Sequence, residues 1–274
     1  MLQNTAKIVS GFLGRGSWAV RAARPAYESV LDLIYKQNGM PWLINGSEFR
    51  IDPHHRHRLG HEYDPSVAEF FRTRLRSGQI CFDIGANVGV YVLQFAKWLG
   101  PSGRVVAFEP NLGARRVLEH HVRINGISDR VTIVPSAVGQ NSGTATLYAA
   151  DADGMSRLNA PNTAIADKVR PVEVPVISVD DYVSQSGIVP DSLMVDIEGF
   201  EIAAIAGAQR LIKEKRDLLI VVEMHPDVWA SASTTRTSAQ ELLDQLELIP
   251  VPLQGQSDAL GDHATVHLRQ RERA

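Results

Sequence analysis

The sequence has almost no cysteine and no long apolar run. Cys81 is the single cysteine among 274 residues, which excludes an intrachain disulfide and is typical of a reducing compartment. No apolar stretch approaches the roughly 20 residues needed to span a bilayer. The apolar run near Ile8 is interrupted by glycine and lacks the small-residue cleavage site of a signal peptide. We therefore predict a cytoplasmic protein.

A strong charge of either sign is also missing. Lys and Arg total 28 against 31 for Asp and Glu, so the formal net charge is −3. A nearly neutral chain has no general attraction for nucleic acid, so we expect no nucleic-acid partner. The hydrophobic content of 44% is ordinary for a globular protein, and the length suits one large domain with an extension.

A strand–turn–helix pattern occupies residues 79–91, QICFDIGANVGVY. The apolar run Ile80–Ile84 predicts a strand buried on both faces, and small residues form a turn from Gly85 to Gly89. Apolar residues then recur at helical spacing up to Leu99. Glycine allows a backbone to approach a ligand closely, and a helix N-terminus offers free N–H groups. The pattern therefore predicts a cofactor cradle.

The chemistry of this turn favours S-adenosyl-L-methionine over a dinucleotide. The turn lacks the G-x-G-x-x-G fingerprint, which leaves a nicotinamide oxidoreductase as a disfavoured alternative. Asp83 precedes the first glycine, where it would repel a pyrophosphate but suits the ammonium group of S-adenosyl-L-methionine. Glu109 ends the next predicted strand, where a carboxylate can accept hydrogen bonds from both ribose hydroxyls.

A third predicted strand, residues 131–135, ends at Ser136 and Ala137. In open α/β sheets, ligands lie outside the carboxyl ends of the strands, which places these two residues against the adenine. The predicted cofactor-binding residues are Asp83, Gly85, Ala86, Asn87, Gly89, Glu109, Ser136 and Ala137.

Acidic side chains and a histidine follow two further predicted strands. The block 191–199, DSLMVDIEG, places Asp196 and Glu198 after a short apolar strand, and residues 200–213 have the pattern of one helix. The strand 217–222 is followed by Glu223 and His225. Because parallel strands end at one edge of a sheet, we predict that Asp196, Glu198, Glu223 and His225 converge as catalytic residues.

Five blocks in this order resemble the FkbM family of S-adenosylmethionine-dependent methyltransferases: FDIGANVGVY, AFEPN, SAVGQNSGTATLY, MVDIEGFE and VVEMHP. The resemblance covers roughly residues 62–226. It implies a class I methyltransferase fold, which is Rossmann-like and doubly wound, with a mostly parallel seven-stranded sheet and one antiparallel strand. It also implies methyl transfer, usually to a hydroxyl oxygen. The family often has a lysine two residues before the aspartate of its D-x-E-G block, where this chain has Met194.

O-methylation of a sugar, glycan or other small molecule requires a base, because an alcohol is a very weak acid. His225 has a suitable unperturbed pKa, and Asp196 is the alternative base or an orienting group. In a variant interpretation, the predicted catalytic residues bind magnesium or manganese, which acidifies the hydroxyl. We favour metal-free catalysis and assign no metal site. A non-catalytic cofactor-binding scaffold, consistent with Met194, is the alternative from another class.

We divide the chain into an N-terminal helical and hairpin extension, 1–61, and a methyltransferase domain, 62–274. Asn45-Gly46 predicts a hairpin over 41–52. The basic segment 1–37 predicts either weak peripheral membrane contact or a helical extension packed on the domain, and we favour the second. The histidine-rich run 54–61 is interpreted as a solvated loop, since adjacent loop histidines seldom converge on one ion. Oligomeric state is left open.

A long polar segment, 151–168, separates predicted strands at 143–149 and 172–179. Loops of this length in compact domains are often functional, so we predict that it closes over the acceptor. Met155, Ser156 and Arg157 are the nearest candidates. Pro175 predicts that the second strand lies at a sheet edge.

Overall fold

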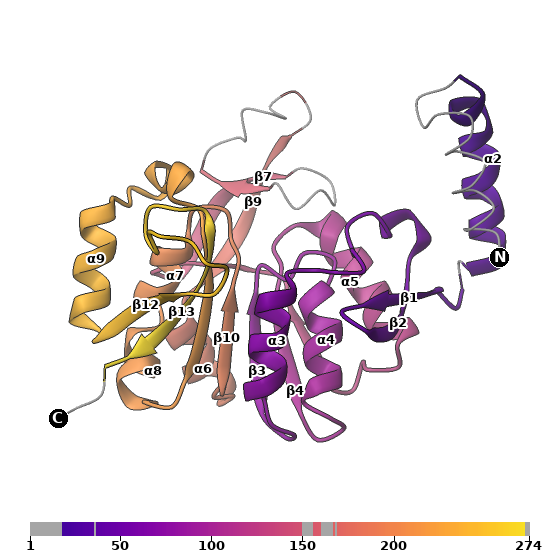
Figure 1. Cartoon of the computed structure of the whole chain (residues 1–274). Helices are drawn as coiled ribbons and strands as arrows, with labels where there is room; N and C mark the ends of the chain where they lie inside the picture. Colours follow the sequence, from indigo (N-terminus) through magenta and orange to yellow (C-terminus); the bar gives the residue numbers. More distant parts are fainter. Residues whose placement is uncertain (1–17, 36, 150–155, 160–166, 168, 272–274) are drawn as a thin grey trace.

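The computed structural model describes residues 18–35, 37–149, 156–159, 167 and 169–271. A seven-stranded sheet forms its centre, with strand order β12-β13-β11-β10-β3-β4-β5 (Figure 1). These strands are β3 Ile80–Ile84, β4 Arg104–Phe108, β5 Val131–Val134, β10 Ser192–Val195, β11 Leu219–Met224, β12 Leu248–Pro252 and β13 Ala264–Gln270. The sheet confirms the predicted α/β fold of class I methyltransferases.

Strand direction creates the site. β3 pairs in parallel with both β4 and β10. From β3 the sheet continues through β4 to β5 on one side and through β10 to β11 on the other, so the strand order reverses at β3. Such a reversal of strand order opens a crevice at the carboxyl ends of the strands, where ligands bind. β13 is antiparallel to β11 and β12, as the resemblance implied.

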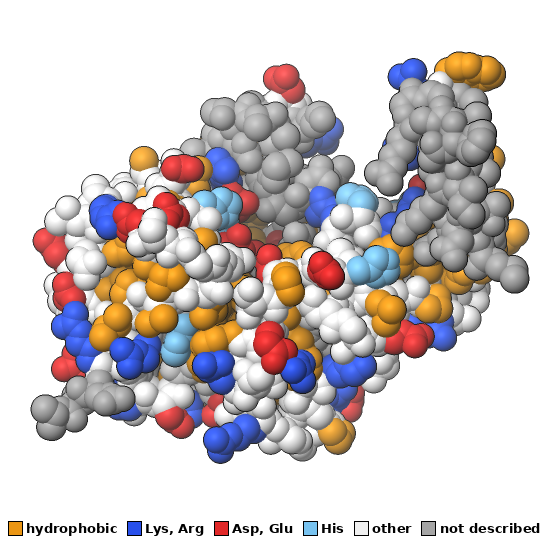
Figure 2. Space-filling view, in the orientation of Figure 1, with side chains coloured by type: hydrophobic (Ala, Val, Ile, Leu, Met, Phe, Trp, Pro, Cys, Tyr) orange, Lys and Arg blue, Asp and Glu red, His pale blue; other side chains and the backbone are white. Residues whose placement is uncertain are grey.

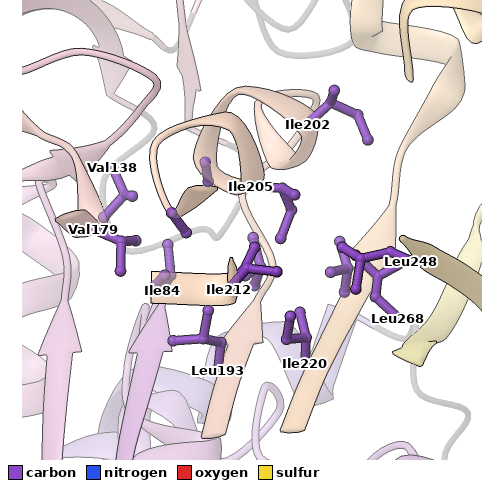
Figure 3. Close-up of a cluster of buried hydrophobic side chains, with 14 of the residues drawn as sticks. Ile84, Val138, Val179, Leu193, Ile202, Ile205, Ile212, Ile220, Leu248 and Leu268 are labelled. Carbon is purple, nitrogen blue, oxygen red and sulfur yellow. The ribbon is translucent and has the colours of Figure 1, made fainter. Parts of the chain in front are cut away.

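Two helical layers cover the sheet because alternate strand residues are apolar on both faces. One layer contains α3 Pro65–Arg74, α4 Val90–Trp98 and α5 Leu112–Ile124. The other contains α6 Val179–Ser186, α7 Glu201–Ala206, α8 Gln209–Glu214 and α9 Arg236–Gln245. Figure 3 shows the second core, in which Ile84, Leu193 and Ile220 of the strands meet helix residues such as Ile205 and Ile212. A core on each face fixes the strand ends that carry the site.

A second sheet, of order β6-β9-β7-β8, rises above the main one (Figure 1). Its strands are β6 Ala137–Val138, β7 Gly143–Ala149, β8 Arg157–Leu158 and β9 Arg170–Ile177. The prediction that Pro175 places its strand at an edge is wrong, since β9 lies between β6 and β7. Proline is tolerated because β6 pairs only with Val176 and Ile177, so Pro175 lies beyond the end of β6.

The predicted helix over 200–213 is also corrected, because it is interrupted between α7 and α8. The Gly207 carbonyl accepts a hydrogen bond from Asp180 N instead of continuing the helix. The Asp180 carboxylate then accepts from Arg210 N and Leu211 N, which caps the start of α8. Tertiary capping from α6 therefore overrides the continuous apolar periodicity.

The N-terminal part contains α2 Trp18–Tyr35, the hairpin of β1 Met40–Ile44 and β2 Ser47–Ile51, and the short helix η1 Pro53–His55. The Asn45-Gly46 turn confirms the predicted hairpin, and both residues have positive φ. Helix α2 docks on η1 through ion pairs of Glu28 with Arg56 and of Asp32 with His54. Residues 1–17 of the basic segment lie outside the described residues.

Charges of both signs are interspersed over the face shown in Figure 2. On α2, Leu31 is fully buried, whereas Trp18 and Leu33 are exposed. Among the helices that the structure describes, none combines the length and apolarity required to cross a bilayer.

Candidate functional site

A cavity lies at the carboxyl ends of β3, β4 and β10. Of the predicted cofactor residues, Gly85, Asn87, Glu109, Ser136 and Ala137 line it. Of the predicted catalytic residues, Asp196 and Glu198 line it. The structure therefore brings five of the predicted cofactor residues and two of the predicted catalytic residues to one cavity, with Leu158 of β8 and Ser156 forming part of its wall.

Glu109 is held by backbone N–H groups at the end of β4. Asn87 N donates to its Oε2 and Asn111 N donates to its Oε1, each at 2.7 Å. Burial raises the pKa of Glu109 to about 7, although both backbone hydrogen bonds oppose this rise. Each carboxylate oxygen retains a lone pair for a further donor, such as a ribose hydroxyl.

Asp83 is buried below the cavity at the end of β3 and does not line it. Burial, assisted by the charge of Glu109, raises its pKa to about 7. Within the described part of the chain, Asp83 Oδ2 and Asn87 Oδ1 are buried without a hydrogen-bond partner. A buried polar atom without a partner costs free energy, and a ligand donor would remove that cost.

Two glycines of the turn have different functions. Gly85 has φ +89°, and a Cβ placed on it would lie 1.9 Å from the carbonyl oxygen of Asp196. Gly85 therefore lets the turn after β3 press against the turn after β10. Gly89 has φ +91°, and its Cβ would meet Leu118 of α5 at 2.5 Å. The structure thus places Gly89 at a helix contact, and Ala86, which is buried, also lies away from the cavity wall.

The polar segment before β9 reaches the site through β8. Arg157 Nη2 lies 3.1 Å from Glu198 Oε2, and both side chains are largely buried. Ser156 Oγ accepts a hydrogen bond from Asn111 Nδ2 at 3.0 Å. Ser156 therefore lines the cavity and Arg157 contacts Glu198 of its wall, while Met155 lies outside the described residues. That this segment closes over the acceptor stays a prediction.

A second cluster surrounds His225 at the end of β11. Its Nδ1 donates to Glu201 Oε1 at 2.7 Å, since a carboxylate oxygen can only accept. Its Nε2 lies 3.9 Å from both Asp196 Oδ1 and Glu223 Oε1. His263 Nε2 lies 3.2 Å from the same Glu223 oxygen. Asp196, Glu223 and His225 therefore converge, as the sequence predicted, whereas Glu198 turns to Arg157.

Sequence reasoning missed Glu201 and His263. Glu201 is fully buried at the start of α7, where Gly199 N, Trp229 Nε1 and His225 Nδ1 all donate to it. It was hidden by its place inside an apparent helix. The signal for His263 was its position just before the last strand. Because β13 is antiparallel to β11, its first residue, Ala264, pairs with Met224 at the carboxyl end of β11.

Burial and mutual repulsion control ionisation in this cluster. Burial, followed by the charge of Glu223, raises the pKa of Asp196 well above its usual range. Burial alone would lower the pKa of His225, but the hydrogen bond to Glu201 and the charges of Glu201 and Asp196 raise it to about 9. His225 is therefore protonated at neutral pH and is a poor proton acceptor in this arrangement.

A family model described as the methyltransferase FkbM domain matches residues 83–248, more than half of the chain. The chain belongs to the FkbM methyltransferase family. A search of curated proteins finds no match. The family match lies inside the predicted domain 62–274 and includes every predicted cofactor and catalytic residue.

One solved structure supports this fold, and two others are reported as more distant similarities. Methyltransferase FkbM from Methylobacillus flagellatus KT is 17% identical, with a TM-score of 0.50; the alignment covers 79% of this chain and 50% of that chain. The present chain thus spans half of that relative. An O-methyltransferase from Thermotoga maritima is 13% identical, with a TM-score of 0.45, over 86% of this chain and 80% of that one. Fibrillarin from Aeropyrum pernix is 13% identical, with a TM-score of 0.45, over 84% and 82%.

Met194 stands where the FkbM family often has a lysine. Met194, two residues before the aspartate of the D-x-E-G block, is fully buried in β10. It packs in the same core as Cys81 and Val221 of the flanking strands. A methionine there fills the apolar layer below α3 and α4 and does not reach the cavity wall.

Proposed function

We propose that this protein is an S-adenosyl-L-methionine-dependent O-methyltransferase acting on a hydroxyl of a sugar, glycan or other small molecule. The observation that carries the proposal is one cavity bounded by Glu109 of the cofactor motif and Asp196 of the D-x-E-G block. The reducing compartment indicated by the single buried Cys81 supports a cytoplasmic location.

The residues of the β3–β4 turns fit this cofactor. Glu109 has acceptor capacity for the ribose, and Ser136 and Ala137 offer a wall for the adenine. Asn87 Oδ1, from a residue of the cavity wall, and Asp83 Oδ2, buried behind that wall, are acceptors without a partner among the described residues, and the methionine ammonium would supply donors. When bound, S-adenosyl-L-methionine supplies a methyl group on a sulfonium; the acceptor oxygen forms the new C–O bond as the sulfur keeps the electron pair of the broken C–S bond.

The residues of the D-x-E-G block and their neighbours bind the acceptor and remove its proton. Asp196, whose pKa is raised by burial and by Glu223, takes the proton of the acceptor hydroxyl. His225 is charged in this arrangement and orients Asp196 across 3.9 Å. The Arg157–Glu198 pair links β8 to the same turn and narrows the entrance for the acceptor. Positioning the acceptor oxygen in line with the methyl group supplies much of the catalysis.

The test is calorimetric titration of the full chain with S-adenosyl-L-methionine, S-adenosylhomocysteine and NAD. It is followed by detection of S-adenosylhomocysteine release with panels of sugars, glycans and hydroxylated lipids. We expect micromolar binding of the first two ligands, no binding of NAD, and turnover with a hydroxylated acceptor that is lost in Asp196→Asn.

Failure of both sulfur ligands to bind would overturn the methyltransferase proposal. Binding without turnover on any acceptor, with Asp196→Asn behaving as the unchanged protein, would favour the non-catalytic scaffold. Glu69→Gln is a suitable control, because Glu69 forms an exposed pair with Arg72 away from the cavity.

A further inference from the structure

The side chains of Glu223, His225 and His263 form a compact donor cluster beside the cavity. One carboxylate oxygen of Glu223 and one ring nitrogen from each histidine all lie within 4.8 Å of one another. Glu223 and His225 come from the end of β11, and His263 comes from the residue before β13. The two histidine rings lie with their centroids 4.3 Å apart. Two segments of the chain, the end of β11 and the residue before β13, therefore bring three ligand-type atoms together.

The hydrogen bonding behind His225 resembles that of a metal-bound histidine. Glu201 is completely buried and accepts the Nδ1 hydrogen of His225, so Nε2 faces the cluster, where a bound cation would take the place of its proton. Metal-binding histidines commonly donate their second ring nitrogen to a carboxylate, which fixes the tautomer and raises ligand basicity. Trp229 Nε1 and Gly199 N donate to Glu201 in turn, so the carboxylate cannot rotate away.

We propose that Glu223, His225 and His263 bind one divalent first-row transition-metal ion. Two imidazoles with one carboxylate suit zinc, cobalt, iron or manganese better than magnesium or calcium, which prefer oxygen ligands. Metal–ligand bonds of about 2.0–2.2 Å place neighbouring donors a little over 3 Å apart. Glu223 Oε1 lies 3.2 Å from His263 Nε2 and 3.9 Å from His225 Nε2, and the three donor atoms lie within 4.8 Å of one another, so they must move closer together when an ion binds.

This site differs from the ligand set considered from the sequence. Glu198 is removed from it by its pair with Arg157, and His263 replaces it. Three protein ligands leave coordination positions open, as in catalytic metal sites. Asp196, 3.9 Å from His225 Nε2, separates the cluster from the cavity.

For a role in catalysis, this inference rests on the proposed function. The acceptor hydroxyl would occupy an open position of the ion, which lowers its pKa, and would pass its proton to Asp196 as the methyl group arrives. The metal site itself rests only on the donor cluster.

The experiment uses the full chain freed of metal by a chelator and titrated with Co²⁺, whose visible absorption reports nitrogen and oxygen coordination. We expect one Co²⁺ per chain, displaced by Zn²⁺ and not by millimolar Mg²⁺. Glu201→Gln should weaken Co²⁺ binding by about 10- to 100-fold, the effect of losing an outer-shell partner. His263→Gln, which removes a ligand, should weaken binding at least as much.

His54→Gln is the matched control, since His54 also lies between two carboxylates, Glu28 and Asp32, on an exposed surface. It should leave the Co²⁺ spectrum and affinity unchanged. His263 is 56% exposed, so its substitution does not threaten folding. Absence of a cobalt band, or equal affinity in His263→Gln and the unchanged protein, would overturn the metal site.

Calorimetry with S-adenosyl-L-methionine on the metal-free protein separates the two proposals. Cofactor binding without a cobalt band would sink the metal site alone. A stoichiometric cobalt band without cofactor binding would establish the metal site and sink the methyltransferase function.

Discussion

The two halves of the candidate site position their charged side chains by different means. In the β3–β4 half, the Glu109 carboxylate is positioned by backbone N–H groups of Asn87 and Asn111. In the β10–β11 half, side chains position one another through the Glu201–His225, Glu223–His263 and Arg157–Glu198 contacts. In the first arrangement the donors are backbone groups of the turns after β3 and β4, whereas in the second both partners of each contact are side chains.

This difference explains which half tolerates change. A backbone-defined site survives substitution of surrounding side chains but not a change in turn conformation. A site defined by side chains loses function when any partner is removed, because the remaining buried groups are left without partners.

The largest loss of stability should come from Gly85→Ala, because Gly85 lies where the turn after β3 contacts the turn after β10. Its φ of +89° is unfavourable for alanine, and the Cβ would overlap the carbonyl oxygen of Asp196. We expect a loss of at least about 2 kcal/mol in the free energy of unfolding, measured by urea denaturation.

Gly126→Ala is the matched control for that substitution. Gly126 also has positive φ, at +65°, but a Cβ there meets nothing within 4 Å. It should cost only about 1 kcal/mol, the conformational penalty alone. Equal losses in the two variants would show that the close approach of the two turns is unimportant.

Asp83→Asn tests the backbone-defined half. Removing the charge should weaken S-adenosyl-L-methionine binding by about 10- to 150-fold, equivalent to a charged hydrogen bond of about 1.5–3 kcal/mol. Thermal stability of the ligand-free protein at pH 8 should not fall, because burial disfavours the ionised Asp83. Calorimetry and a thermal melt measure both quantities, with exposed Asp258→Asn as the control. Retained affinity would remove Asp83 from the cofactor site.

The sequence predicted the backbone-defined half well for a physical reason. A strand, a glycine turn and a helix start are local features, so Gly85, Asn87 and Glu109 could be placed from periodicity and turn chemistry. Gly89 and Ala86 lie outside the cavity wall, and a Cβ at position 89 would meet Leu118, a contact that spacing alone does not reveal.

The β10–β11 half was predicted in outline because strand ends reveal Asp196, Glu223 and His225. The side-chain contacts within this half could not be predicted from local sequence patterns. His263 joins the cluster only because β13 pairs antiparallel with β11, and this pairing of distant segments is part of the tertiary structure. Glu201 looked like an ordinary helical residue, and the break at Gly207 depends on Asp180 in α6. Long-range hydrogen bonds decided each of these points.

The stability of the protein should depend on pH through the buried carboxyls of the β3–β4 half. The pKa values of Asp83 and Glu109 rise from 3.8 and 4.5 to about 7, chiefly by burial. The stability that these neutral carboxyls support is complete below about pH 4 and is lost as the pH rises through 7. Thermal melts of the ligand-free protein should therefore show falling stability over this interval.

Binding of a cationic cofactor should change in the opposite direction. Ionised Asp83 favours the ligand, so affinity for S-adenosyl-L-methionine should rise about tenfold per titrating carboxyl between pH 6 and pH 8. Calorimetry in buffers of different ionisation enthalpy would also detect proton release. In Asp83→Asn the rise should be smaller, and an unchanged slope would assign the titration to Glu109 or another group.

The smallest effect should come from Arg157→Gln, which cuts a side-chain link between the second sheet and the D-x-E-G turn. The pair with Glu198 is about one-fifth exposed on both sides, so its loss should cost no more than about 1 kcal/mol. Hydrogen exchange should accelerate in β8 and the adjoining part of β7, because β8 pairs with β7 only at Leu147 and Tyr148. Exchange in β3 and the affinity for S-adenosylhomocysteine should stay unchanged, because that half depends on backbone contacts. If exchange in β3 rose as well, the two halves would be coupled and the separation drawn between them would fail.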